Sequence, residues 1–93
     1  MNYELVLVLK PLLPEDLKTK VLKKVEEYIA QEGGKLGKKD IWGKKHLAFP
    51  IKKHEEGYYV LYNFSISTDK LKEFEKELTL MGDVLRHMVV KLD

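Results

Sequence analysis

The order in which two kinds of hydrophobic repeat follow one another limits the fold of this chain most strongly. Residues 2–10 place Tyr3, Leu5, Leu7 and Leu9 on one face with period two, which predicts a β-strand. Residues 14–32 repeat apolar side chains at three- and four-residue steps, which predicts an amphipathic helix that ends at the glycine pair 33–34. Two more strands are predicted at 39–51 and 58–66, a second helix from residue 67 to about 82, and a last strand at 84–92.

This order, βαββαβ, predicts an α+β fold of the ferredoxin-like sandwich type. Both helical stripes must be buried, and one four-stranded antiparallel sheet with the two helices on one face does this most simply. Right-handed crossovers place the first and third strands in the middle and the second and fourth at the edges. Pro50 agrees with an edge position for the second strand, because proline cannot donate to a ladder. With 93 residues, we expect one domain over residues 1–93.

The charge is unevenly distributed along the chain. The net charge is +2, but residues 35–54 contain seven lysines and one acid, so this segment carries +6 and the remainder −4. Such an asymmetry is typical of a protein with one surface facing a polyanion. The chain has no cysteine, and its first apolar run is too short for a signal peptide or a membrane span. We therefore expect a cytoplasmic protein without a membrane partner.

The sequence offers no pattern that supports catalysis. The three histidines, His46, His54 and His87, show no helical pairing and no nearby carboxylate triad, so we expect no metal site. The glutamates alternate with lysines on helix surfaces, and the hydroxyl residues at 65–68 suit helix capping. Acylphosphatase shares this fold, but the glycine-rich anion loop that it needs after the first strand is absent. We expect no enzyme, no cofactor and no small-molecule substrate.

The second and third strands leave two kinds of binding open. Lysines and Trp42 on the predicted edge strand either protect it from aggregation or contact RNA or protein. The RNA-recognition motif has the same fold and stacks bases on its central strands, so a free-standing module for single-stranded RNA would use Tyr58, Tyr62 or Trp42. The third strand fits the spacing of that motif poorly and begins with acids, so lysine contacts with the RNA backbone are the favoured alternative.

Four blocks of sequence resemble those of bacterial small-subunit ribosomal protein six. They are Tyr3-Glu4 with Pro11, the block Trp42-Gly43-Lys44-Lys45-His46-Leu47-Ala48-Phe49-Pro50-Ile51, Gly57-Tyr58-Tyr59, and Asp83-Val84-Leu85-Arg86-His87-Met88. The resemblance implies a structural, non-catalytic role in the central domain of the small ribosomal subunit. It also implies a partner, small-subunit ribosomal protein eighteen, with which the family binds small-subunit ribosomal RNA. Lys45 stands where the family usually has arginine, which keeps the charge but loses the bidentate fork.

The resemblance and the charge pattern together give two sets of candidate residues, and we expect a monomer outside the ribosome. The RNA-binding set is Tyr3, Lys45, Lys52, Lys53, His54, Arg86 and His87. The set that contacts the protein partner is Ile41, Trp42, Lys44, His46 and Leu47.

Overall fold

A computed structural model describes residues 2–46 and 56–92, with the backbone alone at 44–46 and 56. The elements follow one another in the predicted order, βαββαβ. They are β1 (Asn2–Leu9), α1 (Glu15–Gln31), β2 (Lys35–His46), β3 (Glu56–Ser65), α2 (Thr68–Leu80) and β4 (Val84–Lys91).

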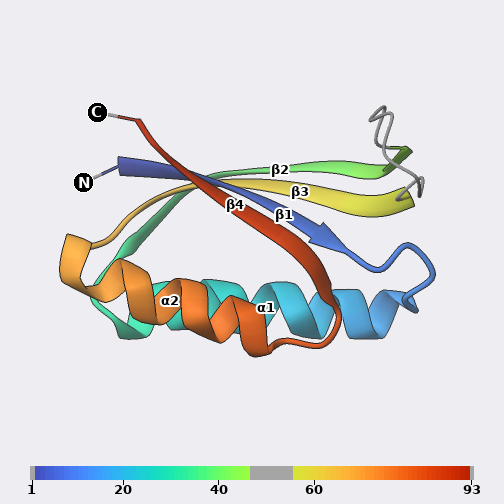
Figure 1. Ribbon diagram of the computed structural model, residues 1–93, viewed down its shortest axis with the longest axis horizontal. Coiled ribbons are helices and arrows are strands. Elements are labelled where there is room, and N and C mark those ends of the chain that lie inside the picture. Colours follow the sequence, from blue (N-terminus) through green and yellow to red (C-terminus); the bar gives the residue numbers. More distant parts are fainter. Residues whose placement is uncertain (1, 47–55, 93) are drawn as a thin grey trace.

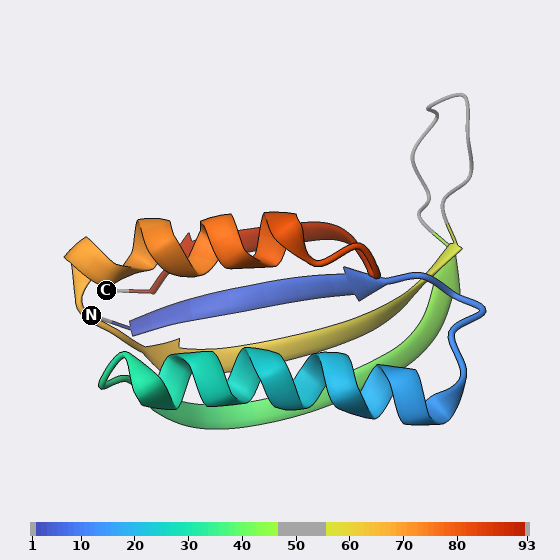
Figure 2. The same cartoon turned by 90° about the horizontal axis from the view of Figure 1, so that it is seen from below.

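The four strands form one antiparallel sheet in the order β2-β3-β1-β4, as predicted for a ferredoxin-like sandwich. Both helices lie on one face of this sheet, and the other face carries no helix (Figure 1). Figure 2 shows α1 running along the β2 and β3 half of the sheet and α2 along β4. The sheet therefore has two edges, β2 and β4, and one face without a helix.

The core lies between the sheet and the helices. Strand β1 contributes the leucines that the period-two pattern predicted, and α1 contributes its apolar stripe. The ring of Phe74 on α2 lies 5.2 Å from that of Phe64 and 5.8 Å from that of Tyr28, centroid to centroid. These rings join both helices to the sheet. The fully or nearly fully buried side chains include Leu5, Leu7, Leu9, Val25, Ile29, Val60, Tyr62, Phe74 and Leu78.

The first helix begins and ends as its sequence predicts. Pro14 precedes α1, and Glu15 and Asp16 in its first turn lie near the positive end of the helix dipole. Gly33 has a φ of +80°, and the amide of Gly34 donates to the carbonyl oxygen of Ile29 at 2.9 Å, which closes the helix end. In the described part of the chain, no helix is long and apolar enough to cross a membrane.

Strand β2 differs from its prediction because it begins at Lys35, four residues before Lys39. Lys35 and Leu36 already pair with Ser65 and Phe64 of β3. The side chains of residues 35–42 are all exposed, so this end of the strand shows no alternation of apolar and polar residues. Edge pairing, and not burial, defines the start of β2, and hydrophobic periodicity does not report it.

Candidate nucleic-acid and partner interface

The edge strand β2 is bulged at two places. Its pairing with β3 shifts between Leu36 and Lys39, and again between Ile41 and Gly43. At the second shift Trp42 is the extra residue, and Gly43 takes a φ of +82°. Only glycine adopts this conformation without strain, so the bulge accounts for a glycine directly after the tryptophan. Bulges interrupt the outer ladder, so this edge is better suited to contacts by side chains than to a long added strand.

We predict that Gly43→Ala lowers the free energy of unfolding by about 1 to 2 kcal/mol, because a Cβ is disfavoured at positive φ. Among the described residues, an added Cβ would meet no atom within 4 Å, so the cost is conformational and not steric. Urea denaturation measures the change. Gly82→Ala is the matched control, since a Cβ there also meets nothing within 4 Å and its φ lies outside the positive region. Equal costs for the two variants would contradict the assignment of strain to the bulge.

Two large apolar side chains lie half exposed along β2. Ile41 is 49% exposed and Trp42 is 47% exposed. The indole Nε1 of Trp42 donates a hydrogen bond to Oδ2 of Asp40 at 3.2 Å, which fixes the ring at the strand edge. Ile41 pairs with the core residue Val60 and so lies on the helix side of the sheet. The edge thus presents apolar surface of the kind that protein interfaces use.

The helix-free face of the sheet is also partly apolar. Val6 pairs with Leu61 on one side and with Met88 on the other, which forms an apolar row across three strands. Met88 is 59% exposed and Val90 is 42% exposed. A pocket of about 500 Å³ lies along β4, where Val6, Met88 and Arg86 line it from this face and Leu78 and Thr79 of α2 line it as well. This face therefore has apolar surface beside Arg86.

The strand register brings the basic positions of β2 and β4 to the same end of the sheet. Gly43 pairs with Tyr59, Tyr59 with Val8, and Val8 with Arg86, so these four residues form one row. At roughly 4.8 Å per strand, this row spans about 14 Å. Lys45 pairs with Gly57, two residues nearer the end of the sheet than this row. Arg86 is exposed, and Nζ of Lys10 lies 4.0 Å from Oδ1 of Asp83.

Two residues predicted to contact RNA are placed differently. Tyr3 is only 3% exposed, and its ring lies 5.6 Å from that of Phe64, at the opposite end of β1 from Arg86. Strand alternation places it with Leu5 on the helix side, so we assign Tyr3 to the core and not to RNA contact. His87 pairs with Leu7 and is partly exposed, so it lies on the other face of β4 from Arg86.

The buried hydroxyl of Tyr62 belongs to a three-residue network. It donates to Oε2 of Glu26 at 2.7 Å, and Nζ of Lys39 lies 2.9 Å from the same oxygen. Burial would raise the pKa of Glu26, but the hydrogen bonds from Tyr62 and Lys39, with the charge of Lys39, lower it on balance. Burial and then the Glu26 hydrogen bond raise the pKa of Tyr62. The network connects α1 to β3 and β2.

The burial of Tyr62 and Tyr58 limits how far these tyrosines can stack on RNA bases. The side chain of Tyr62 has no exposed surface, so it cannot stack on a base. Tyr58 is partly buried, and Nζ of Lys18 lies 4.1 Å from the centre of its ring. Of the three aromatics named for a free-standing RNA module, only Trp42 presents a half-exposed ring. The structure thus weakens the stacking alternative.

We predict that Glu26→Gln lowers the free energy of unfolding at pH 7 by about 1 to 3 kcal/mol, the range for a hydrogen bond to a charged group. A carboxyl whose pKa is lower in the folded state than in the unfolded state stabilises the protein when the pH lies above the unfolded-state pKa, near the ordinary 4.5. This contribution is lost as the pH falls through the folded-state pKa. The variant should therefore lose less stability than the parent below pH 4.5. Glu27→Gln, at an exposed position, is the control. If the free energy of unfolding fell equally with decreasing pH in Glu26→Gln and in the parent, the prediction would be contradicted.

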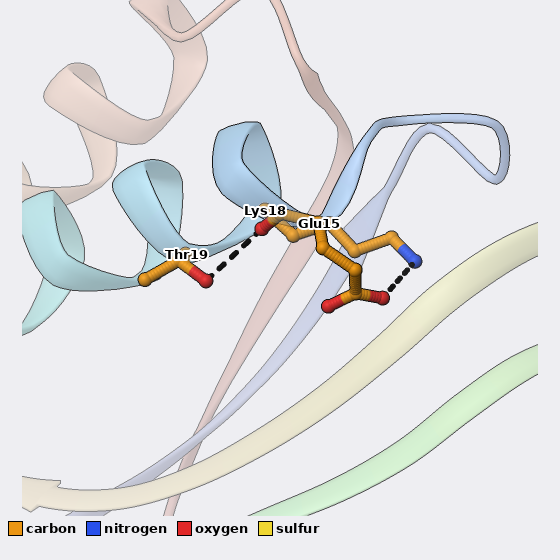
Figure 3. Close-up of polar contacts among 3 residues, drawn as sticks. All are labelled: Glu15, Lys18 and Thr19. Carbon is orange, nitrogen blue, oxygen red and sulfur yellow. Dashed lines mark hydrogen bonds and ion pairs between the residues drawn. The ribbon is translucent and has the colours of Figure 1, made fainter.

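A groove between α1 and β2 was not predicted from the sequence. It measures about 330 Å³, and Lys18, Leu22, Lys23, Lys39, Ile41 and Tyr58 are among its lining residues. Figure 3 shows Glu15 and Lys18 extending from the first turns of α1 on the side of the sheet. The groove depends on the distance between a helix and an edge strand that are separated in sequence, so no local pattern reports it.

Comparisons with known proteins fit this geometry. A family model described as ribosomal protein S6 matches residues 2–91. The chain belongs to the ribosomal protein S6 family. It is 46% identical to small ribosomal subunit protein bS6 of Clostridioides difficile over 89 residues, which is 96% of each chain. It is 40% identical to the protein of the same name from Dictyoglomus turgidum, covering 99% of this chain and 95% of the relative.

Similarity to a solved structure extends this result to three dimensions. The crystal structure of 30S ribosomal protein S6 from Thermotoga maritima matches with a TM-score of 0.87 and 25% identity, over 98% of this chain and 86% of that one. Ribosomal protein S6 is a family of structural proteins of the small subunit and not an enzyme family. The resemblance read from the sequence and the ferredoxin-like fold are both confirmed.

The structure describes some of the predicted S6 interface residues but not all of them. Ile41, Trp42 and Arg86 are exposed, His87 is partly exposed, and Tyr3 is buried. For Lys44, Lys45 and His46 only the backbone is described. Leu47, Lys52, Lys53 and His54 lie outside the described residues.

Proposed function

We propose that this member of the ribosomal protein S6 family binds small-subunit ribosomal RNA together with small-subunit ribosomal protein eighteen. The observation that carries the proposal is the register, which gathers Lys45 and Arg86 at one end of the sheet. Segment 47–55, with Lys52, Lys53 and His54, connects the two strands that end there. The chain acts as one domain, is a monomer outside the ribosome, and works in the cytoplasm as part of the ribosome.

RNA is held through its phosphates. Lysine and arginine side chains displace counterions from the backbone, so the affinity falls as salt rises, with a slope of about 0.7 to 0.9 in log units per phosphate contact. Such contacts position the protein but do not read sequence. Arg86 supplies the planar fork for a bidentate phosphate contact, while Lys45, Lys52 and Lys53 act as point charges. Specificity then comes from RNA shape and from the protein partner.

Ribosomal protein eighteen binds the β2 edge and the neighbouring helix-free face. Trp42 and Ile41 are the largest half-exposed apolar side chains on that edge, and Met88 and Val90 extend the apolar surface at β4. Aromatic and aliphatic anchors inside a polar rim are typical of stable interfaces. The lysines of β2 surround these anchors and prevent unwanted pairing of the free edge.

Co-sedimentation tests this function. A tagged form of the full chain, added to a central-domain fragment of small-subunit ribosomal RNA, should bind more tightly when purified ribosomal protein eighteen is present. The protein partner should sediment in the same particle. An RNA affinity that is the same with and without ribosomal protein eighteen, or no RNA binding under either condition, would contradict the proposal.

A further inference from the structure

The groove between α1 and β2 has an apolar interior and a charged rim. Its interior comes from Leu22, Tyr58 and Ile41. Leu22 is buried, Tyr58 is partly buried, and Ile41 is half exposed. Its volume of about 330 Å³ is sufficient for one large apolar side chain. Ile41 forms part of both this groove and the exposed edge of β2, so the groove continues the surface proposed for the protein partner.

Two lysines connect the walls of the groove, because Lys18 of α1 contacts the Tyr58 ring of β3 and Lys39 of β2 pairs with Glu26 of α1. Nζ of Lys18 lies 3.3 Å from Oε1 of Glu15 and 4.1 Å from the centre of the Tyr58 ring, and the Lys18 side chain is only 13% exposed. Nζ of Lys39 lies 2.9 Å from Oε2 of Glu26. Both carboxylates of the rim are thus engaged by lysines of the rim. The groove is preformed, which reduces the entropy cost of filling it.

The remaining charge on the rim is positive. Once Glu15 and Glu26 are matched with Lys18 and Lys39, Lys23 is the excess cation among the described lining residues. Lys23 is exposed on α1 and lines the groove. Charge complementarity therefore favours an occupant with one carboxylate beside its apolar side chain.

We propose that the groove receives one large apolar side chain of ribosomal protein eighteen, and that a neighbouring carboxylate of the same segment pairs with Lys23. The inference rests on the proposed function and assigns a specific contact within it. Because bulges interrupt β2 on either side of Lys39 and Ile41, side-chain insertion contributes more to this contact than a long backbone ladder. The contact fixes the position of the partner along the strand.

The test measures affinity for purified ribosomal protein eighteen by titration calorimetry with variants of the full chain. Lys23→Glu should weaken binding by about fivefold or more, because an attraction is lost and a repulsion replaces it. Thr19→Trp, at an exposed groove position, should weaken it at least about tenfold by filling the space. The matched controls are Lys20→Glu and Lys20→Trp, since Lys20 is exposed on α1 but lines the separate groove between the helices. Both controls should change affinity less than about twofold.

The outcomes separate the inference from the function on which it rests. If the parent chain binds and both groove variants bind equally well, the groove assignment is overturned while the partnership stands. If Lys23→Glu and Lys20→Glu weaken binding equally, the effect is one of net charge and the groove assignment is again overturned. If the parent chain does not bind ribosomal protein eighteen at all, the proposed function itself fails.

Discussion

Replacing Lys45 and Arg86 together by alanine should weaken binding to small-subunit ribosomal RNA by roughly 25- to 60-fold at about 0.1 M salt. Relative to 1 M salt, each phosphate contact raises the logarithm of the binding constant by about 0.7 to 0.9 at 0.1 M salt. Two lost contacts therefore lower the affinity by the product of two such factors. The register places the two positions at the same end of the sheet, on different strands. Filter binding across a salt series measures both the affinity and its slope, which should fall by about 1.4 to 1.8.

The control for this prediction removes the same charge from another surface. Lys20 and Lys24 are exposed on α1, on the side of the groove between the helices. Replacing both by alanine removes two positive charges, as does the variant at Lys45 and Arg86, but should leave the salt slope unchanged. Equal losses in the two double variants would show that RNA responds to net charge alone. That result would contradict a basic surface at one end of the sheet.

Phe74→Ala should lower the free energy of unfolding by about 3 to 5 kcal/mol, a large share of the stability of a domain of this size. The ring is 1% exposed and packs between Phe64 of β3 and Tyr28 of α1. Truncation removes a ring from the place where both helices meet the sheet, and the rigid strands beneath it cannot close the cavity.

Urea denaturation followed by circular dichroism measures this loss. Leu80→Ala is the control on the same helix, since Leu80 is 69% exposed and its truncation should cost less than about 1 kcal/mol. Phe74→Leu should recover about half of the loss because it fills part of the space. A cost for Phe74→Ala no larger than that for Leu80→Ala would contradict the packing described for this core.

The sequence predicted the fold because each element carries its own periodicity. The alternation of Leu5, Leu7 and Leu9 identifies β1 and its buried face, and the apolar stripe of α1 identifies the side that faces the sheet. The start of β2 was not predicted, because the exposed residues near Lys35 form a strand through pairing with β3 alone. Local patterns report burial, and edge pairing involves little burial.

The interface itself stays a prediction. Ile41, Trp42 and Arg86 were named from the resemblance and the charge pattern, and the structure exposes all three. Tyr3 was included in the RNA-binding set, but alternation buries its side chain among the core residues. The Glu26 network and the groove beside α1 could not be predicted, because they join residues from elements that only the tertiary fold brings together.

The most direct test of the account is cross-linking with mass spectrometry on small ribosomal subunits that contain this chain. Lys45, Lys52 and Lys53 should cross-link to ribosomal RNA, and Lys23 and Lys44 should cross-link to ribosomal protein eighteen. The helix lysines on the far side, Lys20 and Lys24, should remain accessible to solvent reagents. Cross-links to RNA that come from those two helix lysines, with none from the end of the sheet, would contradict the central claim.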